Sequence, residues 1–130
     1  MIVTTDIQNI LFLKCKDLGI EDIRQNPKEI TGELSSEMIA IHAKPQKGEK
    51  YWKKDFVEVN LCVPDIEGEA DLIRIGELER IAQSKLESVG KYDETSYRYS
   101  IYSTGIESDE GLKCHYVNVR LLFEVLNVKL

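Results

Sequence analysis

Apolar and polar residues follow first a helical period and then a period of two. From Ile7 to Leu18 the apolar residues recur every three or four positions, which predicts an amphipathic helix over residues 5–18 that ends before Gly19. Residues 20–36 contain turn formers but no sustained period. We therefore expect a long irregular connection across the surface between this helix and the first strand.

Two alternating segments come next, and we expect them to pair as an antiparallel hairpin. The first begins at Met38 and the second covers residues 56–63, each with apolar residues on one face. The connection between them is short and polar, whereas a parallel crossover would need about a dozen or more residues, usually helical.

The C-terminal half repeats this order. Apolar residues at helical spacing predict a helix over residues 71–89, with Gly90 just beyond its C-terminus. Residues 97–102 and 117–125 then alternate on either side of a polar turn at residues 105–111. This pattern predicts a second hairpin with a long terminal strand.

The elements therefore follow the order helix, strand, strand, helix, strand, strand within a single domain over residues 1–130. A helix with one apolar stripe has to bury it, and a sheet with one apolar face offers the partner surface. We predict an α+β fold, a two-layer sandwich in which a mostly antiparallel four-stranded sheet carries both helices on one face. The other face mixes polar and apolar side chains, and faces of that kind are often exposed to solvent and also often covered in an oligomer.

Composition agrees with an ordinary globular domain. Of the 130 residues, 42% are hydrophobic and 31% charged, which excludes disordered and collagen-like classes. No apolar run approaches the roughly 18–20 residues of a membrane helix, and the first residues lack the features of a signal peptide. We expect a cytoplasmic protein that neither enters a membrane nor is exported by a signal peptide.

Net charge and cysteine content further restrict the kinds of function and binding site that the chain could have. A net charge of −6 repels phosphate backbones, so specific nucleic-acid binding is not predicted. Cys15, Cys62 and Cys114 are an odd and widely spaced set, which indicates neither a disulfide framework nor a zinc site. We expect them to be small buried residues in a reducing compartment.

No motif points to catalysis, and we predict neither an enzyme nor a bound metal or other cofactor. Residues 65–71 place carboxylates at alternate positions, but Gly76 stands at the twelfth position, where a calcium loop needs glutamate. The downstream Glu-x-Lys of metal nucleases is also missing. His42 and His115 are the only histidines, and a cysteine nucleophile with a histidine base stays open as an alternative that no local signature supports.

A lysine-rich segment between the first two strands is unusual on this acidic chain. Five lysines surround two aromatic residues there, and they give a candidate protein-interaction site made of Lys47, Lys50, Tyr51, Trp52, Lys53 and Lys54, preceded by Lys44. Aromatic side chains are enriched at interface hot spots. Three interpretations remain open: a solvated hairpin tip, a contact with an acidic surface such as residues 65–71 of a neighbouring copy, or a contact with nucleic acid.

Two segments carry a resemblance to a known family. Residues 56–64 (FVEVNLCVP) lead into a helix, and residues 111–125 combine a polar turn, His115 and Tyr116 with alternating apolar positions. In these features and in element order the chain resembles phage tail-terminator and head–tail completion proteins over nearly its whole length. The lysine-rich segment departs from that family.

The resemblance implies a structural protein incorporated in a virion. Such a protein forms a ring, often a hexamer, that caps the tail tube and joins it to the head, so its partners would be copies of itself and a tail tube or head-connector protein. No catalytic residues are implied. The alternative is a small cytoplasmic α+β binding module that holds a protein or small-molecule ligand with residues 20–36 and the outer sheet face.

Overall fold

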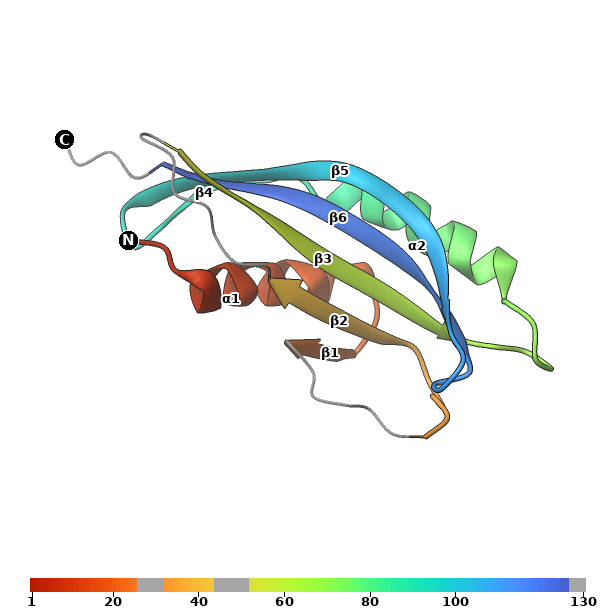
Figure 1. Ribbon diagram of the computed structural model, residues 1–130. Coiled ribbons are helices and arrows are strands. Elements are labelled where there is room, and N and C mark those ends of the chain that lie inside the picture. Colours follow the sequence, from red (N-terminus) through yellow and green to blue (C-terminus); the bar gives the residue numbers. More distant parts are fainter. Residues whose placement is uncertain (26–31, 44–51, 127–130) are drawn as a thin grey trace.

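A computed structural model of the protein describes residues 1–25, 32–43 and 52–126 and shows one curled six-stranded sheet with two helices (Figure 1). The elements in chain order are α1 (Thr4–Cys15), the 3-10 turn η1 (Lys16–Leu18), β1 (Asp22–Gln25), β2 (Met38–Ala43), β3 (Trp52–Pro64), α2 (Leu72–Lys85), β4 (Ser88–Tyr92), β5 (Thr95–Asp109) and β6 (Cys114–Leu126). The strands lie in the order β1-β2-β3-β6-β5-β4.

The predicted four-stranded antiparallel sandwich is wrong. β1 pairs with β2 in parallel and β4 adds a strand beyond β5, so the sheet is mixed and curls into a half-barrel. Strands make up about half of the described residues, so the sheet and not a balance of two layers dominates the fold. The sequence pattern misses β1 because these four residues carry no period-two alternation, and only their partner β2 holds them extended.

The second helix ends at Lys85 and not at residue 89 as its spacing predicts. Gly90 is therefore not a helix terminus and lies in β4 opposite Tyr97. A Cβ atom at this position would come within 2.7 Å of the Tyr97 hydroxyl oxygen, so only glycine lets the strand pass this ring without displacing it. Packing against β5 thus overrides the helical period of this segment.

Two strands are also longer than predicted. β5 continues through the expected turn at residues 105–111, because β6 pairs with it as far as Asp109 opposite Cys114. A β-bulge between Ile101 and Ser103 interrupts this register. β3 begins at Trp52 and not at residue 56, since β6 also pairs with its polar first residues.

The main core lies on the inner face of the sheet, and both helices contribute to it. α1 supplies residues such as Ile7 and Leu11, and α2 supplies Ile75 and Leu78, all fully buried. On the sheet, alternate residues of β3 and β6 complete this cluster. Such alternation is the burial pattern of a strand with one covered face. A smaller cluster on the opposite face is formed by Leu34, Met38, Ala40, Cys62, Leu112 and Cys114.

Replacement of a buried α2 side chain tests this packing. Leu78→Ala is expected to lower the free energy of unfolding by about 2–5 kcal/mol, because the lost side chain leaves a cavity in the core. Ile73→Ala on the same helix is the matched control, since that side chain is exposed and its loss is expected to cost less than about 0.5 kcal/mol. Urea unfolding measures both, and equal effects would contradict the described orientation of α2.

Candidate functional site

The three cysteines are buried, and metal-ligating side chains are not clustered in the described part of the chain. Within residues 1–25, 32–43 and 52–126, no three His, Cys, Asp or Glu side chains are grouped so that they could hold a metal ion. Burial raises the pKa of Cys15 and Cys62 to about 12 and that of Cys114 to about 11. At these pKa values the three thiols are protonated at neutral pH.

His115 has a structural contact. Its Nδ1 lies 2.7 Å from Oδ1 of Asp65, and the Asp65 backbone N–H donates to the Lys113 carbonyl at 3.0 Å. These two bonds attach the chain that leaves β3 to the start of β6. The histidine thus holds in place the segment that follows, residues 65–73, which we call the acidic tip.

The acidic tip projects beyond the end of the sheet as a tight turn (Figure 1). Ile66 and Glu69 exchange backbone hydrogen bonds of 2.8 and 3.0 Å, and Glu67 and Gly68 between them adopt positive φ angles of 51° and 78°. These are the features of a two-residue turn of type I′. The turn gives the tip a defined shape.

Side chains at the tip combine negative charge with exposed apolar surface. Ile66, Leu72 and Ile73 are 59%, 68% and 80% exposed, and Glu67 and Glu69 are exposed beside them. An open groove of about 430 Å³ runs between these side chains. Clustered apolar groups that the core does not need mark a surface for contact with another molecule.

Hydrogen bonds at the start of α2 hold the acidic tip firmly. The Asp71 carboxylate caps the helix by accepting from the Arg74 backbone N–H at 3.2 Å. The Arg74 guanidinium donates to both Glu37 oxygens, at 2.6 and 2.9 Å, and to Glu77 at 3.1 Å. These carboxylates raise the pKa of Arg74, so it stays charged and ties α2 to the chain before β2.

Two lysines of the predicted contact site lie at the opposite end of β3. Lys53 and Lys54 are the second and third residues of this strand, and Lys54 is exposed. The other predicted contact residues, Lys47, Lys50 and Tyr51, lie outside the described residues. Of Trp52 only the backbone is described, and it pairs with Leu126. We call this end of β3, with Lys53 and Lys54, the lysine end.

β3 separates the two charged ends. Its 13 residues run from Trp52 at the lysine end to Pro64 at the base of the acidic tip, a length of roughly 40 Å at strand spacing. Pairing with β6 along the whole strand keeps it extended. The molecule therefore presents two oppositely charged surfaces that cannot meet within one copy.

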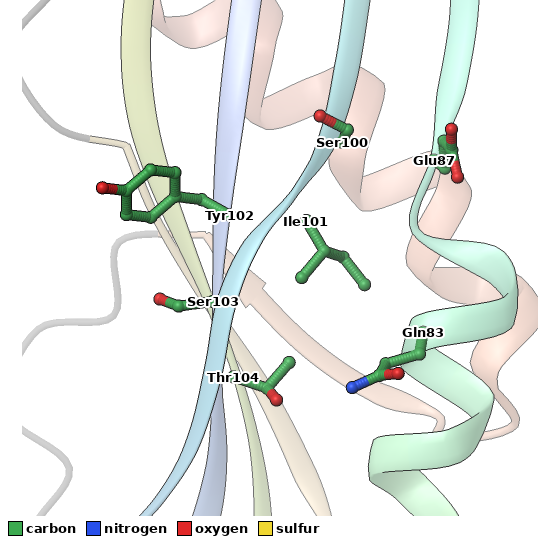
Figure 2. A pocket seen from close by; sticks show the side chains of 7 residues that line it. All are labelled: Gln83, Glu87, Ser100, Ile101, Tyr102, Ser103 and Thr104. Atoms are coloured by element: carbon green, nitrogen blue, oxygen red, sulfur yellow. The ribbon is translucent and has the colours of Figure 1, made fainter.

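A third feature, which the sequence analysis does not identify, is an open edge along β5. β4 pairs only with residues 95–99, so within the described chain no strand lies beside residues 100–109 on the side away from β6. A groove of about 510 Å³ follows this edge toward α2 (Figure 2). Gln83 and Glu87 line its helix side, and Ile101 and Thr104 point into it from β5.

Aromatic and cationic side chains stabilise the outer face near this edge. The rings of Phe56 and Tyr102 meet edge to face with centroids 5.1 Å apart, and the Arg120 guanidinium lies 4.1 Å from the Phe56 centroid. Such cation–π contacts suit a half-exposed sheet face. They hold the Tyr102 ring on the opposite side of β5 from Ile101 (Figure 2).

Comparison with known proteins does not assign the chain to a family. No family model matches it, and none of the curated proteins matches its sequence. No helix in the described part of the chain is long and apolar enough to cross a membrane.

Asp55 is a buried acid in β3 near the lysine end. It is only 4% exposed, and no side chain among the described residues donates a hydrogen bond to its carboxylate. Loss of hydration raises the pKa of Asp55 to about 6, while the Phe56 backbone N–H lowers this pKa in part. The folded protein therefore takes up this proton at a higher pH than the unfolded chain, whose aspartate has a pKa of about 3.9.

This shift predicts a pH-dependent effect of Asp55→Asn. Wild-type stability should fall as the pH rises through about 6, because the charged form is then buried, and should recover toward pH 4. Asp55→Asn is expected to raise the free energy of unfolding by about 1–2 kcal/mol at pH 7.5 and by little below pH 4. Urea unfolding across this range tests the prediction, and a variant less stable than wild type at pH 7.5 would contradict it.

Proposed function

We propose that this protein is a non-enzymatic structural subunit that assembles head to tail with copies of itself, the acidic tip of one copy contacting the lysine end of the next. The observation that carries the proposal is the placement of these two surfaces at opposite ends of β3. A contact between two different surfaces of the same chain is heterologous, so each added copy leaves one surface of each kind free. Such contacts close into a ring or continue as a filament.

Charge and apolar surface have separate parts in this contact. Carboxylates of the tip attract the lysines of the approaching copy and fix its orientation, which raises the association rate more than the final affinity. Burial of Ile66, Leu72 and Ile73 supplies affinity, since an aliphatic side chain gains roughly 1.5–3 kcal/mol when it is fully buried. The net charge of −6 disfavours association in orientations that do not bring these opposite charges together.

The family resemblance supports a more specific version of this proposal. We propose that the assembly is a ring, with six copies as the expected number, that caps a phage or prophage tail tube and joins it to the head. The subunit would be made in the cytoplasm of the bacterial host and then incorporated in a virion. Its second partner would be the tail tube or head-connector protein.

A ligand-binding module is the second candidate, and one observation favours it. The ends of the predicted irregular connection form an open groove of about 410 Å³, lined by Gly19, Ile20, Glu21, Asp22, Ser36 and Glu37. A protein that used this groove alone would stay monomeric. The oligomeric state therefore separates the two candidates.

Charge reversal at either end tests head-to-tail assembly. Lys53→Glu/Lys54→Glu, or Glu67→Lys/Glu69→Lys, is expected to weaken self-association at least roughly tenfold, because like charges then meet at the contact. The variant that carries all four substitutions should assemble again, since its two ends are complementary with reversed signs. Sedimentation velocity at 0.05 and 0.5 M NaCl measures each, and wild-type association should weaken at the higher salt.

The control is a variant with the same charge change on the helical segments, Lys16→Glu/Arg80→Glu, where both side chains are exposed. It should assemble as wild type does. A wild-type protein that is monomeric at every concentration, alone and with a tail tube protein, would contradict the proposal, as would a four-fold variant that assembles no better than either pair alone.

A further inference from the structure

We propose that the open edge of β5 is a strand-accepting site, where an extended segment of a partner protein pairs with residues 100–109. The proposal goes beyond head-to-tail assembly, because it uses neither the acidic tip nor the lysine end. It concerns a different protein as partner and a contact made mainly by the backbone.

Unpaired backbone groups along this edge provide the first argument. Alternate N–H and C=O groups of a strand point to each side. On one side of residues 100–109 they pair with β6, while on the other side the described chain offers no backbone partner. A strand added here would lie in line with β4, which occupies the same side of residues 95–99.

The composition of the edge provides the second argument. Edges of sheets are normally protected by charge, proline, short length or a β-bulge, and of these the open edge has the bulge between Ile101 and Ser103. β1 at the other border of the sheet is four residues long and carries the Asp22–Arg24 ion pair at 3.0 Å. By contrast, residues 100–106 (SIYSTGI) contain neither charge nor proline, although 31% of the whole chain is charged.

The groove beside the edge has room for the side chains of an added strand. Ile101 and Thr104 point into it, while Gln83 and Glu87 stand across from them (Figure 2). Further along β5, Ile106 is 50% exposed. Every second side chain of the added strand would therefore lie over Ile101 or Ile106, and an aliphatic residue fits there.

Flanking charges define the partner further. Glu87 borders the groove, and Glu107 and Asp109 lie at the far end of the open edge. The carboxylate of Glu107 also accepts a hydrogen bond from the Tyr116 hydroxyl at 2.8 Å, which fixes its position. We infer an occupant that is extended, aliphatic at alternate positions and basic at its ends, and an acidic segment would be repelled.

A blocked synthetic peptide with the sequence KVTVTVTVK serves as the probe. It is added to the Lys53→Glu/Lys54→Glu variant at a concentration where sedimentation gives a monomer, so that binding is measured without head-to-tail assembly. Hydrogen exchange followed by NMR is expected to slow at least roughly tenfold at alternate amides of residues 100–109, and not at β1. Failure of this result would leave the proposed self-assembly unaffected, because the variant removes only that contact.

Matched peptides and variants decide whether the backbone makes the contact. A peptide N-methylated at alternate residues, and the acidic peptide EVTVTVTVE, should bind at least roughly tenfold more weakly. Ile106→Lys should weaken binding of the first peptide to a similar extent, whereas Val89→Lys on the exposed side of β4 should not. Absence of protection along β5, equal binding of the N-methylated peptide, or equal effects of the two lysine variants would overturn the proposal.

Discussion

The pairing of β3 with β6 is the constraint on which the rest of the structure depends. Thirteen consecutive residue pairs join the two strands, from Trp52 opposite Leu126 to Pro64 opposite Cys114. The inner side chains of this ladder form the centre of the core that both helices cover. The same ladder sets the distance between the lysine end and the acidic tip. On the other side of β6, β5 extends past the end of β4 and leaves an open edge.

Rigidity distinguishes the acidic tip from an ordinary loop. The Asp65–His115 bond and the Asp71 cap hold its two ends, and Arg74 ties α2 to Glu37. A surface that is already ordered loses little conformational entropy when it binds, so more of the energy of burying Ile66, Leu72 and Ile73 becomes affinity. Because these three apolar side chains are exposed, they lower the solubility of the isolated subunit, and the surrounding carboxylates counteract this effect.

Sequence patterns predict the elements whose signal is local and miss those that depend on a partner strand. Both helices and the strands around Ile39, Val59 and Val119 are found close to where their periods place them. β1 and β4 are missed because Asp22–Gln25 has no alternation and the residues after Lys85 continue a helical period. The lysines and the acidic segment are visible in the sequence, but their position at opposite ends follows only from the β3–β6 register. The open edge of β5 exists because β4 pairs only with Thr95 to Tyr99, and no sequence pattern in residues 95–109 predicts where that pairing stops.

Disulfide crosslinking between the two ends tests the central claim most directly. Lys54→Cys and Glu67→Cys place exposed thiols at the lysine end and on the acidic tip, while the three native cysteines are buried. After mild oxidation at a concentration where the protein assembles, the double variant should give a ladder of covalent oligomers that ends at the ring size, and each single variant should give no more than dimers. A double variant that stays monomeric, or that forms only the dimers seen with the single variants, would contradict head-to-tail assembly.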